Sequence, residues 1–174
     1  MRNLSVLVLL MSFTLTAFGQ QEGFTSPETD SVFVVKKVDK LAGTSTLEAN
    51  EYLRLDDMKG KTIVISPALA QTNLVVMTFG TEGCNERDKM IILFENGEKL
   101  NLSSWNKFNC NATGYYKLSK KDLKLIKTTP METVRVTNGR THESVTVDVP
   151  DNLKRYFIQV YKSYESGVYF EVEK

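Results

Sequence analysis

The segment from Cys84 to Cys110 constrains the fold most strongly, because it predicts a β-hairpin that a disulfide closes at its base. Two apolar runs, residues 90–94 and 99–102, flank the tetrapeptide Glu-Asn-Gly-Glu at 95–98. Asn-Gly between two apolar runs is the strongest short-range signal for a hairpin, since a type I′ turn needs positive φ at both central residues. We therefore expect a tight antiparallel hairpin in this segment.

A two-residue loop at Asn96-Gly97 would also set the register of this hairpin. It pairs Leu93 with Leu100 and Ile91 with Leu102. Side chains two residues apart on a strand point to the same face, so all four would lie in the core. A shift by one residue would pair apolar with polar positions, which indicates that the register is well specified.

The two cysteines of the chain are expected to form this disulfide. Two cysteines in an exported protein most simply bond to each other. A nucleophilic thiol would instead need a depressed pKa and a reducing compartment. The chain contains one histidine, and neither Cys84 nor Cys110 lies beside it in the sequence.

The N-terminal residues predict a cleaved export signal. A charged start at Arg2 precedes the largely apolar residues 4–15, and Ala17-Phe18-Gly19 is a small-x-small cleavage site. We expect residues 1–19 to be a signal peptide, residues 20–31 a flexible lead-in, and residues 32–174 a single β-rich domain. The apolar run is short for a membrane span, so we expect none in the mature chain. The mature protein would be exported to the periplasm or the extracellular space.

The charge balance argues against a polyanionic partner for the domain as a whole. Removal of residues 1–19 takes away Arg2 and no acid, which leaves equal numbers of basic and acidic side chains. A neutral domain has no overall attraction for nucleic acid or for an anionic membrane, so its total charge disfavours both partners, and we expect no nucleic-acid partner.

The pattern of short apolar runs predicts an α+β fold that is predominantly antiparallel β, a curved sheet or sandwich-like, with two short helices in the C-terminal half and one disulfide. Strands are expected around residues 32–35, 52–55, 62–65, 74–79, 115–118 and 168–170, with a loop at 43–46 and a second Asn-Gly hairpin turn at 138–139. Ser119 can cap a helix that Pro130 ends, and Pro150 can open a helix that runs to about Tyr164 before Gly167.

Four aromatic residues are the candidates for a binding surface. Trp105, Phe108, Tyr115 and Tyr116 lie in and just after the disulfide-closed loop. If they are exposed together, they form an aromatic recognition surface. If they pack beneath the disulfide, they form a satellite core, and this reading is favoured because large exposed apolar patches are uncommon on monomers.

Residues that could carry chemistry are few. His142 is the one histidine and follows the second turn, where a solvent-exposed hairpin residue is the simpler interpretation. Glu82, Glu86 and Asp88 make an oxygen-rich loop near Cys84, but without the ligand spacing of a calcium EF-hand loop. No His/Cys set suits zinc, and we expect neither a metal site nor a cofactor.

One dense basic run stands out from the balanced charge. Lys117, Lys120, Lys121, Lys124 and Lys127 lie on and just before the first expected helix. They could form a patch for anionic glycans or lipid headgroups, although a solvated helix face is the plainer interpretation.

Several motifs occur together in a recognisable order. They are G-C-N-E at 83–86, I-L-F-E-N-G-E-K-L at 92–100, N-K-F-N-C at 106–110, V-T-N-G-R at 136–140 and Y-F-I-Q at 156–159. This order resembles a group of small, uncharacterised exported bacterial proteins. The resemblance implies an envelope location and a shared fold with both cysteines as fixed parts, and it brings no activity, cofactor or catalytic residue.

The sequence therefore favours a non-enzymatic exported domain that binds a protein or a glycan through sheet edges or the loops around the disulfide. Catalytic residue types are scarce, while turn-rich β scaffolding is plentiful. Two alternatives stay open: a secreted hydrolase that uses acidic residues, and a small-ligand carrier with an apolar barrel interior.

We predict that the protein recovered from the cell exterior or envelope begins at Gln20. Its intact mass should equal that of residues 20–174 less two hydrogens, and alkylation should label two thiols only after reduction. A mass that retains residues 1–19, or labelling without reductant, would contradict the prediction.

Overall fold

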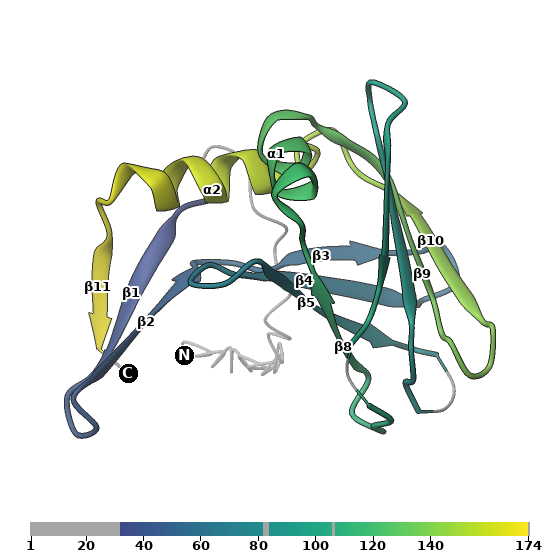
Figure 1. The fold of residues 1–174 in the computed structure, drawn as a ribbon, viewed down its shortest axis with the longest axis horizontal. Coiled ribbons are helices and arrows are strands. Elements are labelled where there is room, and N and C mark those ends of the chain that lie inside the picture. Colours follow the sequence, from purple (N-terminus) through teal and green to yellow (C-terminus); the bar gives the residue numbers. More distant parts are fainter. Residues whose placement is uncertain (1–31, 82–83, 106, 174) are drawn as a thin grey trace, which may run out of the picture.

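The computed structural model describes residues 32–81, 84–105 and 107–173 (Figure 1). The expected signal peptide at 1–19 and lead-in at 20–31 lie outside these residues. The described strands are β1 (Val34–Asp39), β2 (Thr44–Ala49), β3 (Leu53–Asp56), β4 (Thr62–Ala68), β5 (Asn73–Phe79), β6 (Lys89–Phe94), β7 (Lys99–Ser103), β8 (Thr113–Lys117), β9 (Met131–Thr137), β10 (Ser144–Asp148) and β11 (Phe170–Glu173). The helices are α1 (Lys120–Thr128) and α2 (Tyr156–Ser166).

The strands form three sheets, with the orders β11-β1-β2, β3-β4-β5-β8 and β10-β9-β6-β7. The pairings are antiparallel except that of β1 with β11, which is parallel. The predicted fold class is confirmed: mostly antiparallel sheet, two short helices in the C-terminal half, and a disulfide between Cys84 and Cys110. No helix within the described residues is long and apolar enough to cross a membrane.

The core lies between the inner faces of the two four-stranded sheets, and the helices cover it on one side (Figure 1). Along β4 and β5, buried residues alternate with half-buried ones, as expected where one face packs on a core and the other faces solvent. Phe94 from β6, Tyr116 from β8 and Phe157 from α2 are among the largest side chains that fill this core.

The Cys84–Cys110 segment is a hairpin, but its register differs by one residue from the prediction. Leu93 pairs with Lys99 and Ile92 with Leu100. The turn has three residues: Gly97 N–H donates to the carbonyl of Phe94 at 2.8 Å, and Gly97 takes φ +80°. This is a type I turn followed by a left-handed glycine, which shifts the pairing relative to a two-residue turn.

The observed register is the one that buries the larger side chains. Met90, Ile92 and Phe94 lie in the core, whereas Ile91 and Leu93, which were expected there, are only partly buried. Packing of the Phe94 ring therefore decides which face of β6 is internal. The Asn-Gly pair predicts where the turn lies but not which type of turn it is.

Helix α1 begins as predicted. The Ser119 side chain accepts a hydrogen bond from the N–H of Asp122, and the Asp122 carboxylate accepts one from the N–H of Ser119, so the two residues form a capping box. The second helix starts later than predicted, at Tyr156, because the carbonyl of Lys154 accepts a hydrogen bond from the N–H of Met131 in β9. Gly167 ends this helix in the left-handed conformation, as expected.

Strand β2 occupies residues that were predicted as a loop. Thr44, Ser45 and Thr46 pair with the end of β1. Their hydroxyl-bearing side chains are exposed on an edge strand, where polar residues are tolerated, so tertiary pairing decides their conformation.

Three buried tyrosines make the core sensitive to alkaline pH. Burial raises the pKa of Tyr116 and of Tyr156 above their usual range, and raises the pKa of Tyr161 to about 12. Above about pH 10 the unfolded chain loses these phenolic protons while the folded chain keeps them.

We therefore predict that the free energy of unfolding falls as pH rises above about 10, by up to about 1.4 kcal/mol per pH unit for each of these tyrosines. Urea denaturation between pH 8 and 11 measures this slope. Tyr161→Phe should make it shallower, while Phe79→Leu, which changes an exposed ring without a titratable group, should leave it unaltered. Equal slopes for the wild type and Tyr161→Phe would contradict the prediction.

Candidate functional site

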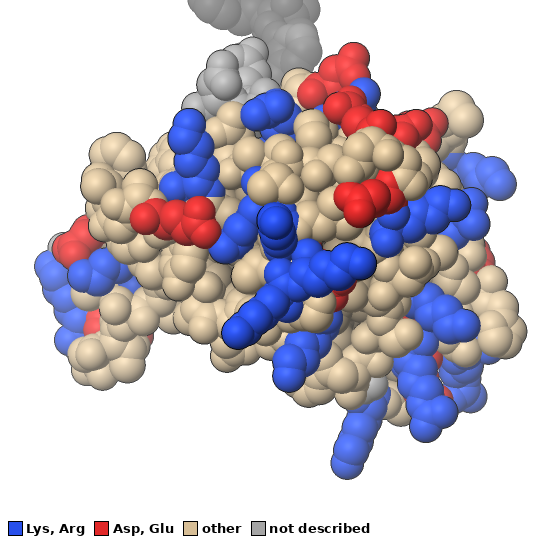
Figure 2. Space-filling view, turned by 45° about the horizontal axis from the view of Figure 1, so that its top comes forward, with Lys and Arg blue, Asp and Glu red and all other residues tan. Residues whose placement is uncertain are grey.

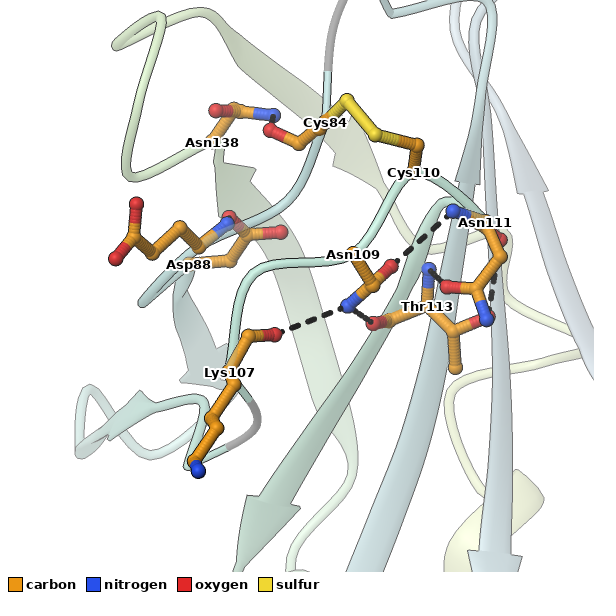
Figure 3. The surroundings of a disulfide bond; sticks show 9 residues. Cys84, Asp88, Lys107, Asn109, Cys110, Asn111, Thr113 and Asn138 are labelled. Carbon is orange, nitrogen blue, oxygen red and sulfur yellow. Dashed lines mark hydrogen bonds between the residues drawn. A yellow bond between two sulfur atoms is a disulfide. The ribbon is translucent and has the colours of Figure 1, made fainter.

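The disulfide joins the two ends of the segment that carries the β6-β7 hairpin. Next to it, Asn85 and Asn109 form an isolated antiparallel bridge, with N–H to carbonyl distances of 2.7 and 3.0 Å. The Asn109 side chain also donates to the carbonyl of Thr113 at 3.1 Å and accepts from the N–H of Asn111 (Figure 3). The backbone that follows Phe108 is thus held by covalent and hydrogen bonds together.

A buried carboxylate, Asp88, fixes this region to the second hairpin. Its side chain accepts hydrogen bonds from the N–H of Gly139 at 3.0 Å and from the Asn85 side chain, and its carbonyl accepts from the N–H of Ser104 at 2.8 Å. Asp88 is 2% exposed. A buried carboxylate needs such donors, so its role here is structural.

The β9-β10 turn approaches the disulfide loop closely. Asn138 donates from its side chain to the carbonyl of Cys84 at 3.4 Å (Figure 3). A Cβ atom at Gly139 would clash with the carbonyl oxygen of Glu86 and lie 2.6 Å from that of Arg87. Only glycine fits this contact, which explains why Gly139 follows Asn138 although its φ is not positive.

Three of the four predicted aromatic residues lie on the surface beside this anchored loop. Trp105, Phe108 and Tyr115 are 62%, 51% and 37% exposed, so the favoured expectation that they pack as a satellite core is wrong for them. The N–H of Trp105 donates to the carbonyl of Tyr115 at 3.0 Å, and the two ring centroids are 5.5 Å apart. Arg140, which was not predicted as a site residue, lies over the Phe108 ring, with its guanidinium carbon 5.4 Å from the ring centroid. We call these four residues the aromatic patch.

Tyr116, the fourth predicted residue, does not belong to the aromatic patch. It is completely buried, since neighbouring side chains on strand β8 point to opposite faces and Tyr115 takes the outer one. Its ring also lies where a side chain on Gly114 would be, within 2.9 Å of the position of a Cβ there. Tyr116 is therefore a core residue.

The outer face of the β3-β4-β5-β8 sheet continues from the aromatic patch into a groove. Tyr115 pairs with Val75, and Val75 with Ser66. A groove of about 640 Å³ lies over Ser66 and Val75, with Tyr52 and Leu47 also in its wall. Trp105, Tyr115, Val75, Ser66 and Tyr52 thus follow one another across neighbouring strands. The usual spacing between strands places Tyr52 about 19 Å from Trp105.

The groove carries little charge. Its floor is formed by Ser66, Ala68, Val75 and Met77, and the one carboxylate in its wall is Glu48. Lys37 Nζ lies 2.7 Å from Glu48, and this hydrogen bond raises the pKa of the Lys37 amine. An uncharged floor on the solvent side of a sheet suits a neutral or apolar chain.

The remaining candidates do not converge on one point. His142 is exposed, with φ +61°, in the β9-β10 turn, and the Ser144 hydroxyl contacts Thr137. Glu86 is partly buried beside Asp88, whose carboxylate is engaged with N–H donors, and Glu82 lies outside the described residues. Among the described residues, no three His, Cys, Asp or Glu side chains are grouped closely enough to hold a metal ion.

Neither a protein-family model nor a curated protein nor a solved structure matches this chain.

We predict that Gly139→Ala lowers the free energy of unfolding by about 3 kcal/mol. The new Cβ forces the turn away from the 84–88 loop, which adds steric cost and removes the donor to buried Asp88. Gly97→Ala is the matched control, because nothing lies within 4 Å of its Cβ position and only its positive φ is strained, at about 1 kcal/mol. Equal losses in urea denaturation of the two variants would show that the close contact does not matter.

Proposed function

We propose that this protein is a non-enzymatic, exported binding domain of the bacterial envelope, which holds a protein or glycan partner on the aromatic patch. The observation that carries the proposal is the exposure of the Trp105 and Tyr115 rings, whose centroids are 5.5 Å apart, and of the Phe108 ring beneath Arg140, in and just after the disulfide-closed segment. Trp, Tyr and Arg are the residue types that dominate binding energy at interfaces, and Arg140 completes the set.

The rigid attachment of the disulfide-closed loop supports a binding role for the exposed side chains of the aromatic patch. A disulfide, the Asn85–Asn109 bridge and the buried Asp88 contacts fix the backbone around the aromatic patch. A surface that is ordered before binding loses less conformational entropy when the partner arrives. Loops held on a rigid scaffold are also where binding residues concentrate.

The adjacent groove extends the surface that a partner can use. Stacking on Trp105 and Tyr115, followed by contact with Val75 and Ser66, suits an extended chain that crosses the strands. A length of about 19 Å corresponds to about six residues of extended peptide. A partner of this shape would be a peptide segment or a linear glycan.

The alternatives have less support from the described residues. The grooves over Ser66, beside Asp57, beside Glu165 and over Ile91 each carry at most one carboxylate, whereas glycoside hydrolysis needs a pair. The space between the sheets, which a carrier would use, is filled by side chains such as Phe94 and Phe157. Export rests on the expected signal peptide and on the disulfide, which persists in oxidising compartments.

Trp105 is the only tryptophan in the chain, so its fluorescence reports directly on the proposed site. We predict that titration with fractionated envelope extract shifts its emission to shorter wavelength and protects it from acrylamide quenching, because a partner removes water from the ring. Protease treatment or periodate oxidation of the active fraction then distinguishes a protein from a glycan.

Trp105→Ala should weaken retention of the same partner on immobilised protein at least tenfold, with a stability loss below about 1 kcal/mol because the ring is exposed. Phe170→Ala is the matched control, since it removes a similarly exposed ring from β11. Equal retention by the wild type and both variants would reject the aromatic patch as the binding site.

A further inference from the structure

Helix α1 presents a row of lysines to solvent. Lys120, Lys121 and Lys124 are exposed, and Lys124 lies four residues after Lys120 and three after Lys121, so the three share one side of the helix. We call these three residues the lysine face. Figure 2 shows Lys and Arg side chains gathered across the middle of this side of the molecule, with few acidic side chains between them.

The lysine face is not neutralised by its surroundings. None of its three residues has an ion-pair partner among the described residues, whereas the next lysine, Lys127, pairs with Glu165 at 2.7 Å. The one acidic residue of α1, Asp122, is engaged in the capping box with Ser119. A local positive field therefore exists on a domain whose total charge is close to zero.

The apolar side of α1 is occupied by the core. Ile126 is buried, Leu123 and Leu125 pack against the core, and no large apolar side chain of α1 is among the strongly exposed ones. The helix therefore cannot insert apolar residues into a bilayer, and it offers neither an aromatic platform for nucleic-acid bases nor an apolar anchor for a protein interface.

We propose that the lysine face docks the protein electrostatically onto a membrane surface that contains anionic lipids. Lysine ammonium groups are compact point charges without the fork of arginine, which suits attraction to a layer of headgroups more than recognition of one shaped ligand. A groove of about 360 Å³ beside the row is lined by Lys120, Lys124 and Lys127 and also by Glu165, the ion-pair partner of Lys127; it gives room for headgroup phosphates next to Lys120 and Lys124. This proposal does not rest on the aromatic patch.

Docking in this orientation leaves the other side of the domain free. The helices lie on the core side of the β3-β4-β5-β8 sheet (Figure 1). Ser66 and Val75 line the groove on the outer face of this sheet. A membrane beneath α1 would therefore not cover that groove.

The test is co-sedimentation of the full-length mature protein with vesicles. We expect binding to vesicles of equal parts phosphatidylglycerol and phosphatidylcholine at 0.05 M NaCl, little binding to phosphatidylcholine alone, and loss of binding towards 0.5 M NaCl as the charges are screened. No sedimentation with the anionic vesicles at low salt would overturn the proposal.

Two double variants distinguish binding through the lysine face from attraction by lysines elsewhere on the surface. Lys120→Gln with Lys124→Gln should weaken the partition coefficient about 25-fold, at about fivefold for each lysine. Lys59→Gln with Lys89→Gln removes the same charge from exposed positions outside α1 and should change it less than twofold. Unchanged thermal midpoints establish that both variants fold. Equal weakening by the two pairs, or binding to soluble dextran sulfate that vesicles fail to compete, would overturn docking to lipid by this face.

Discussion

The Asp88 carboxylate holds together the part of the molecule on which the candidate site depends. It is buried, and the donors that surround it come from the disulfide loop and from the β9-β10 turn. Removing any one donor would leave a buried oxygen of Asp88 short of a hydrogen bond, so each partner constrains the others. The disulfide closes the chain at this place, but the carboxylate determines how closely Gly139 and the 84–88 loop approach each other.

This constraint explains why aromatic side chains can remain in water here. The backbone hydrogen bond between Trp105 and Tyr115 and the contact between their rings hold both residues in place, so their side chains are ordered without being buried in the core. Arg140 comes from the turn that Asp88 holds, and its guanidinium stacks on Phe108. The disulfide-closed segment and the β9-β10 turn, which are distant in sequence, thus both contribute residues to the aromatic patch. Their relative position follows from the buried hydrogen bonds of Asp88.

Local sequence signals predicted the elements better than their pairing. The capping box at Ser119 and the glycine end at Gly167 involve neighbouring residues, and both are present. The hairpin register depended on which face of β6 could bury Phe94, which is a property of the whole core. The start of α2 depended on a hydrogen bond from Met131 to Lys154, which no local pattern contains.

The candidate site was predictable to a similar extent. Its aromatic residues could be named from their place in the disulfide loop, and strand alternation could have separated Tyr115 from Tyr116 in advance. Arg140 and the groove over Val75 could not be found in this way, because they reach the site through pairing between distant segments. The sequence of β5 is almost continuously apolar, so it did not mark Val75 and Met77 as outward-facing; only the burial pattern of the folded strand does so.

The parallel pairing of β1 with β11 has a consequence for how the chain acquires its structure. Lys36 and Glu171, which face each other across these strands, are 135 residues apart in sequence. Strand β1 can therefore pair with β11 only after synthesis has reached the C-terminal residues, and the β11-β1-β2 sheet is incomplete before that point. Until then one edge of β1 lacks its partner and is open to pairing with another chain.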